Sequence, residues 1–299
     1  MPEWKIVNPY IAYTPTRFYE DVARIQEKYS DFISVSSIGQ TACGQSIPLL
    51  TFGYGPTKLL FTGAIHPNEH ITASYLMHAL ETYAEHYVQG QLYANRNIAE
   101  ILERYTLYFV PMINPDGVSL VTEGYRFIDM ATAIERYPGF TETMRRSWRR
   151  NLNNVDLNRN FPFMWADENN AGPHGGSELE TQALIQLCSE NEFAYLISCH
   201  ASGQVLYWRD PINGEVPGDA DLANRIRAIT GYKLEPISLS ENGLYCGGFE
   251  NWFRGTFLRP AITVEFTPSK STTLPYDNIH FDSLLWDKAY ALIPALCLG

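Results

Sequence analysis

Four short apolar runs, separated by helical patterns, place the strongest constraint on what this chain can fold into. Runs of roughly four to eight apolar residues are typical of strands buried on both faces, and here they cover residues 58–62, 107–113, 195–199 and 261–266. Apolar side chains recur at helical spacing in the intervals, over residues 18–29, 71–88 and 179–188. The alternation predicts an α/β sandwich with a mixed, largely parallel twisted sheet flanked by helices.

The chain has 299 residues, a length that alone would allow about two domains of roughly 150 residues each. We find no linker, internal repeat, low-complexity stretch or shift in composition that would divide it. We therefore expect residues 1–299 to form a single domain.

Charge and hydropathy exclude several classes of partner. The net charge of −11 argues against a nucleic-acid-binding protein, which usually carries a basic excess. The run at 107–113 is far shorter than the ~18 apolar residues of a membrane span, so we expect no membrane insertion. The first residues lack the basic and apolar regions of a signal peptide. This favours a cytoplasmic protein, or one of the cell envelope or secreted if a leader or wall-binding region has been removed.

The five cysteines are widely spaced and form no C-x-x-C pair, which argues against a cysteine zinc cage or a thioredoxin-like site; they are Cys43, Cys188, Cys199, Cys246 and Cys297. We expect buried free thiols in a reducing compartment.

Each apolar run leads into a polar signature. The first is followed by residues 63–69 and the second by residues 114–117, while the third and fourth end at His200 and Glu265. Open α/β sheets build their sites at the carboxyl ends of strands. The four signatures therefore predict one shared site.

The first signature contains His66 and Glu69, separated by two residues. Catalytic zinc commonly takes two histidines and one glutamate and keeps one position for water. The alternative for these two residues is an ordinary helix start, at which a glutamate favours the helix dipole.

His70 adds a second possibility, because residues 66–70 also fit the H-x-x-E-H pattern in which both histidines bind zinc and the glutamate is the base. That arrangement needs both histidines on one helix face. Pro67 suits a first helical turn, which would leave His66 outside the helix. We therefore expect His70 to be an ordinary first-turn residue.

Two further segments are rich in groups that could bind an anion. Residues 155–161 include Asn158 and Arg159, which could grip a carboxylate; the alternative is a loop that caps itself. Residues 145–150 contain four arginines. This run is either a solvated face or a means of attracting an anionic peptide, with Arg149 reaching the chemistry.

Together these segments resemble the zinc metallocarboxypeptidase family, of which carboxypeptidase A is the familiar member. The resemblance covers nearly the whole chain and includes the stretch 38–48 before the zinc motif and the signatures 114–117 and 156–161 after it. It implies one Zn²⁺ per chain, held by three residues in the family's order, His66, Glu69 and His200.

The resemblance also implies roles for six other residues. Glu265 matches the general base, Arg149 the arginine that stabilises the oxyanion, and Asp156 the carboxylate that orients a ligand histidine. Asn158 and Arg159 match the pair that binds the substrate's carboxylate. Tyr245 is a candidate for the mobile tyrosine that closes over substrate.

Segments 158–162, 200–208 and 247–253 resemble the bacterial γ-D-glutamyl-meso-diaminopimelate peptidases more than digestive carboxypeptidases. This implies cleavage of the γ-D-glutamyl–diaminopimelate amide in murein tri- or tetrapeptides, and a role in cell-wall recycling. The alternatives are an ordinary metallocarboxypeptidase acting on α-linked peptides and an N-acyl amino-acid deacylase. A non-catalytic binding protein is disfavoured because the positions of the three metal ligands, the general base and the arginine are all filled.

Overall fold

The computed structural model describes residues 5–124, 141–168, 170–210, 214–236, 247–268 and 275–297. Within these ranges a central sheet has eight strands in the order β1-β2-β6-β3-β7-β10-β8-β9. The strands are β1 (Ile33–Gln40), β2 (Ser46–Gly53), β3 (Thr57–Thr62), β6 (Tyr105–Val110), β7 (Phe193–His200), β8 (Val205–Arg209), β9 (Lys233–Pro236) and β10 (Ala261–Glu265). A separate two-stranded hairpin pairs β4 (Leu92–Tyr93) with β5 (Arg96–Asn97).

The central four strands of the sheet, β6, β3, β7 and β10, run parallel to one another. Antiparallel pairs flank them, with β1 and β2 extending the sheet beyond β6 and β8 pairing with β10. The predicted mixed, largely parallel sheet is confirmed. His200 and Glu265 lie at its carboxyl edge, as the last residues of β7 and β10.

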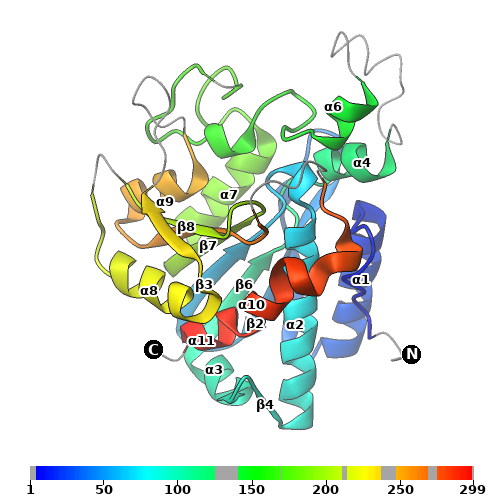
Figure 1. Cartoon of the computed structure of the whole chain (residues 1–299), viewed down its shortest axis with the longest axis vertical. Helices are drawn as coiled ribbons and strands as arrows, with labels where there is room; N and C mark the ends of the chain where they lie inside the picture. The colour runs from blue at the N-terminus through cyan, green and yellow to red at the C-terminus, as the bar shows by residue number, and fades with distance from the viewer. Residues whose placement is uncertain are drawn as a thin grey trace.

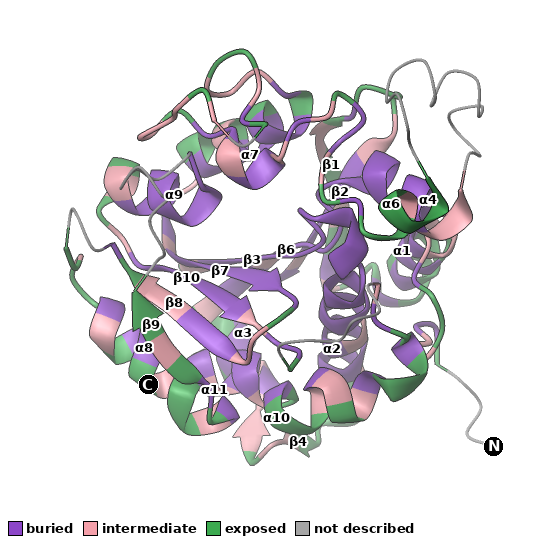
Figure 2. Cartoon of the chain, turned by 45° about the horizontal axis from the view of Figure 1, so that its top comes forward, coloured by how far each residue is buried: buried purple, intermediate pink, exposed green. Residues whose placement is uncertain are grey.

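Helices cover both faces of the sheet (Figure 1). One face carries α1 (Pro15–Tyr29), α2 (Ile71–Gln89), α3 (Ile98–Arg104), α8 (Asp219–Thr230), α10 (Asp287–Ala289) and α11 (Leu292–Cys297). The other carries α7 (Leu179–Glu190) and α9 (Phe249–Phe257), as Figure 2 shows. Short elements complete the described chain: η1 (Pro67–Glu69), α4 (Pro115–Glu123), α6 (Glu142–Arg146), η2 (Leu157–Arg159), η3 (Asn278–His280) and η4 (Asp282–Trp286).

The buried strands fill two hydrophobic clusters, one on each face. Leu59 and Phe61 of β3 belong to the cluster beneath α2, whereas Leu60 between them belongs to the cluster beneath α7 and α9. This follows from the two-residue repeat of a strand, which sends successive side chains to opposite faces. Both faces are apolar, so these strands read as continuous apolar runs.

Two boundaries differ from the sequence prediction. The apolar run 107–113 continues past the end of β6 at Val110, because Pro111 has no N–H with which to extend the ladder. Pro67, expected in the first turn of the helix that contains residues 71–88, lies instead in the separate single turn η1, and α2 begins at Ile71.

The cysteines follow the expectation only in part. Cys188, Cys199 and Cys297 are buried free thiols, but Cys43 is exposed, in the loop between β1 and β2. Cys246 lies outside the described residues. No helix within the described residues is long and apolar enough to cross a bilayer.

Glu180, in the first turn of α7, carries a buried carboxyl group whose Oε1 has no hydrogen-bond partner among the described residues. Burial raises the pKa of Glu180 to about 7, and the charges of Asp116 and Glu178 act in the same direction. The folded state therefore holds a proton that the unfolded chain releases near its ordinary pKa of 4.5. The contribution of Glu180 to the free energy of unfolding is therefore fully present below about pH 4.5 and is lost as the pH rises to about 7.

We expect Glu180→Gln to remove this loss. Between about pH 5 and pH 8 the free energy of unfolding of the wild type should fall, relative to that of the variant, by on the order of 3 kcal/mol. Urea unfolding of both proteins at the two pH values measures the difference. A gap between them that does not change with pH would show that Glu180 titrates normally in the folded state.

Candidate metal centre and active site

The loop after β3 delivers His66 and Glu69 to one point. His66 stands at the N-cap of η1 with extended backbone (φ −93°), and Pro67 occupies the first position of that turn, where a missing N–H costs nothing. The single 3₁₀ turn then brings Glu69 back over His66, so that Oε1 of Glu69 lies 3.1 Å from Nδ1 of His66. His66 therefore lies outside the helix, as the sequence predicts.

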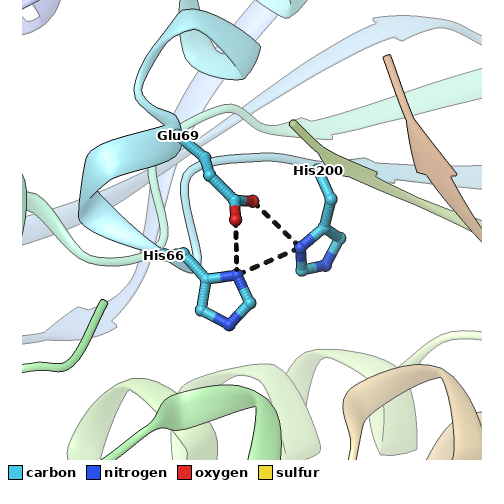
Figure 3. Close-up of side chains that lie close together, drawn as sticks. All are labelled: His66, Glu69 and His200. Carbon is cyan, nitrogen blue, oxygen red and sulfur yellow. Dashed lines mark hydrogen bonds and ion pairs between the residues drawn. The ribbon is translucent and has the colours of Figure 1, made fainter. Parts of the chain in front are cut away.

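His200 reaches the same point from the end of β7. Its Nδ1 lies 3.1 Å from Oε2 of Glu69 and 3.2 Å from Nδ1 of His66. Figure 3 shows the two imidazole rings and the carboxylate facing one another. All three side chains are buried.

The donor set of this triad fits a zinc ion. The ligand atoms of the three residues lie within 4.8 Å of one another, and two imidazole nitrogens with one carboxylate oxygen are the ligands that catalytic zinc takes in peptidases. Although burial alone would raise the pKa of Glu69, His66, Arg149 and the hydrogen bond from His200 hold it well below its ordinary value. The carboxylate of Glu69 is thus negatively charged, which suits binding of a cation.

His70 takes no part in this group. It stands between η1 and α2 as the N-cap residue of α2, is buried, and its Nδ1 has no hydrogen-bond partner among the described residues. Burial lowers the pKa of His70 to about 4. The triad found within the described chain contains His66, Glu69 and His200 without His70, so the geometry gives no support to the H-x-x-E-H alternative.

The second nitrogen of His66 faces Asp156, with Nε2 lying 3.3 Å from Oδ1. Asp156 is fixed as the N-cap of η2, since the same oxygen accepts the backbone N–H of Asn158 at 3.0 Å. Burial would raise the pKa of Asp156, but His66 and Arg159 lower it to about 2. Asp156 thus lies within hydrogen-bond distance of a site histidine, and its role in orienting that ring stays a prediction.

The second nitrogen of His200 faces a carboxylate that the sequence analysis missed. Nε2 of His200 lies 3.3 Å from Oε1 of Glu250 and 3.2 Å from the hydroxyl of Ser198. Glu250 is buried in the first turn of α9. Its only signal in the sequence is an acidic residue after Gly247-Gly248 at a helix start, and the helix dipole explains such a residue equally well.

Glu265 lies beside the triad because of strand register. It is the last residue of β10 and pairs with His200, the last residue of β7. Its Oε2 accepts the backbone N–H of Ser202 at 2.6 Å. Burial and the negative charge of Glu69 raise the pKa of Glu265 to about 7, while His200 and the Ser202 hydrogen bond oppose the rise.

The arginines of the basic run 145–150 do not all lie at the site. Arg149 donates to Oε1 of Glu69 at 2.8 Å, and its side chain is 46% exposed, so the guanidinium borders both the triad and solvent. Arg145 is instead bound to Glu142 and to the carbonyl groups of Leu120 and Val121. Of the run, Arg149 is the residue that reaches the triad.

Asn158 and Arg159 lie in η2, directly after Asp156. Oδ1 of Asn158 accepts the backbone N–H of Phe249 at 2.8 Å, and Arg159 donates to the carbonyl oxygen of Asn158 at 2.6 Å. These bonds anchor the segment, so the self-capping interpretation of this loop is correct in part. Tyr245 lies outside the described residues.

The signature 114–117 contacts the loop that carries His66 and supplies no side chain to the triad. Asn114 caps α4 by accepting the N–H of Gly117 at 2.9 Å and donates to the carbonyl oxygen of Ile65 at 3.4 Å. A Cβ at Gly117 would overlap the ring of Pro67, so only glycine lets α4 pack this closely on η1. The expectation that all four signatures share the site is therefore wrong for this one, which positions the loop that carries His66.

Asp116, from the same signature, ties the stretch 38–48 to this support. It accepts hydrogen bonds from the hydroxyl of Thr41 at 2.8 Å, the backbone N–H of Cys43 at 3.0 Å and the amide of Gln45 at 2.5 Å. Two of the segments that resemble the family before and after the zinc motif thus pack on each other.

A buried His–Glu–His triad at the carboxyl edge of a largely parallel sheet, with a second glutamate and an arginine beside it, is the arrangement of a zinc peptidase. The chain matches the zinc carboxypeptidase family over residues 18–243 and belongs to it. It is accordingly a zinc metallopeptidase of the carboxypeptidase type.

Individual relatives agree with this assignment. The chain is 28% identical over 303 residues to γ-D-glutamyl-L-diamino acid endopeptidase 1 of Lysinibacillus sphaericus, with 94% of this chain and 72% of the relative covered. The crystal structure of thrombin activatable fibrinolysis inhibitor shares the fold at a TM-score of 0.77 and 16% identity, covering 97% of this chain and 74% of that one. Carboxypeptidase A of Helicoverpa armigera does so at 0.72 and 15% identity, covering 98% and 75%.

Proposed function

We propose that residues 1–299 form a single catalytic domain that hydrolyses the γ-D-glutamyl–meso-diaminopimelate amide of peptidoglycan-derived peptides. The observation that carries this proposal is the similarity to the γ-D-glutamyl-L-diamino acid endopeptidase of Lysinibacillus sphaericus, which extends over 94% of the chain. Its substrate would be a murein tri- or tetrapeptide, and its role the recycling of wall peptides.

His66, Glu69 and His200 would hold one zinc ion through the atoms that converge in the triad. When bound, zinc lowers the pKa of a water molecule towards ~7 and polarises the scissile carbonyl. In the structure Arg149 contacts two of the converging atoms, Oε1 of Glu69 and Nδ1 of His66. Because a metal ion would take these atoms, the half-exposed guanidinium becomes available for the oxygen of the carbonyl under attack.

Glu265 would act as the general base. Its carboxylate stands next to His200 at the strand ends and keeps one oxygen on the N–H of Ser202, which leaves the other to take a proton from the attacking water. The same proton then passes to the leaving amine. A pKa raised to about 7 suits this task, because an efficient base titrates near the working pH.

Asn158 and Arg159 would bind a carboxylate of the substrate. Hydrogen bonds to Phe249 and within the loop already anchor both residues, so little order is lost when substrate binds. Tyr245 is proposed to close over the substrate from the segment before α9. These groups suit a substrate rich in carboxylates, in contrast to the chain as a whole, which is acidic with a net charge of −11.

The bond that is cut distinguishes this proposal from its alternatives. We expect L-Ala-γ-D-Glu-meso-diaminopimelate to be cleaved at least tenfold faster, in kcat/KM, than an α-linked peptide of the same length, and a chelator to abolish both reactions. Rapid cleavage of the α-linked peptide alone would indicate an ordinary metallocarboxypeptidase. Turnover of N-acyl amino acids with neither peptide cleaved would indicate a deacylase.

A further inference from the structure

We propose that Glu250 is a positioning residue that holds the ring of His200 in the orientation and tautomer needed to bind the metal, an inference that rests on the metal centre proposed above. Carboxylates commonly fix a metal-binding histidine through the ring nitrogen that does not touch the metal. Nothing in the sequence motifs assigns Glu250 this task.

The position of His200 carries the first step. Figure 3 shows its Nδ1 directed at Glu69 and His66, with the other ring nitrogen pointing away from them. That second nitrogen, Nε2, lies 3.3 Å from Oε1 of Glu250 and 3.2 Å from the hydroxyl of Ser198. Both oxygens lie within reach of a proton placed on Nε2, and the tautomer that carries it leaves the lone pair of Nδ1 free for a metal ion.

Burial makes this contact decisive. His200 is 1% exposed and Glu250 is 4% exposed, so neither side chain can exchange the other for bulk water. Without the carboxylate, only the neutral hydroxyl of Ser198 faces Nε2, and a neutral acceptor binds an N–H more weakly than a charged one. The alternative tautomer and a rotated ring then become more populated, and both of these lower the affinity for metal.

The two histidines of the triad are held in the same way from two directions. His66 has Asp156 at 3.3 Å from its Nε2, and His200 has Glu250 at the same distance. These carboxylates belong to one framework, because Asn158, whose N–H is bound to Asp156, accepts the N–H of Phe249 next to Glu250. The backbone of Gly247 adds a second tie, through the N–H of Phe161 at 2.8 Å.

Zinc affinity, measured by competition with a chromophoric chelator, tests the proposal. Glu250→Ala should weaken zinc binding by about 10–100-fold, and Glu250→Gln should restore most of the loss, since its amide oxygen can accept the N–H of His200 from the same position. Asn251→Ala is the matched control, because Asn251 is the next residue of α9 and is equally buried at 4%. We expect it to keep the wild-type affinity.

Three results would overturn the proposal. Unchanged zinc affinity in Glu250→Ala together with a raised KM would mean that Glu250 contacts the substrate. An equal loss in Asn251→Ala would mean that zinc binding responds to the packing of α9. A loss in Glu250→Gln as large as that in Glu250→Ala would show that accepting the hydrogen bond is not what Glu250 contributes.

The same titrations separate this inference from the proposed function. If wild-type zinc binding disappears in His200→Ala but is unchanged in the Glu250 variants, the metal centre stands and only the role of Glu250 is overturned. If the wild type binds no zinc that depends on His200, both proposals are overturned.

Discussion

Glu265→Gln is expected to lower kcat by about 10²–10⁴-fold while leaving zinc binding unchanged. Glutamine has nearly the size of glutamate and its oxygen can still accept the N–H of Ser202, which lies 2.6 Å from the carboxylate in the structure. It cannot take a proton from water, so the variant loses the general base and little else. Steady-state kinetics and metal content measured on the same preparation check both parts of the expectation.

Glu180→Gln is the control for this substitution. It replaces another buried glutamate in the same way, on α7 and outside the triad, and we expect its kcat to equal that of the wild type. Normal turnover by Glu265→Gln would show that Glu265 is not the base. Loss of zinc from that variant would mean that Glu265 supports the metal instead.

His200→Ala is expected to strip zinc from the protein and His70→Ala to retain it. His200 supplies one of the three converging ligand atoms, and two remaining ligands bind zinc far more weakly than three. His70 is buried beside the triad but outside it, so its removal leaves all three ligands in place. Zinc per chain after dialysis, determined by elemental analysis, distinguishes the two variants.

Circular dichroism shows whether each histidine variant is folded, which matters because both side chains are buried. The opposite pattern, in which folded His70→Ala loses zinc and folded His200→Ala keeps it, would contradict the proposed ligands. That pattern would favour the arrangement in which His66 and His70 bind the metal together.

Much of the fold could be predicted because period and burial act locally. The run 58–62 became β3 (Thr57–Thr62), and the pattern 71–88 became α2 (Ile71–Gln89). The limits of these elements depend on single residues that interrupt hydrogen bonding, as Pro111 does after β6. The shared location of His66, His200 and Glu265 was also predictable, since parallel strands end at one edge of the sheet.

The residues that support the site were harder to predict, because they act through contacts between distant segments. Glu250 touches His200 from α9, and Asp156 touches His66 across 90 residues of chain. Asp156 could be proposed only from resemblance to a family, and Glu250 not at all. The structural task of Asn114 was missed for the same reason, since its bond to the carbonyl group of Ile65 spans two separate loops.

The central claim is the identity of the bond that is hydrolysed, and one measurement tests it most directly. The zinc-loaded protein is incubated with L-Ala-γ-D-Glu-meso-diaminopimelate in water enriched in heavy oxygen, and the products are analysed by mass spectrometry. Our account predicts labelled L-Ala-D-Glu, with the label in the γ-carboxyl group, and unlabelled free diaminopimelate. Free alanine that carries the label in its carboxyl group would contradict this account. So would a substrate that stays uncleaved while α-linked control peptides are cut.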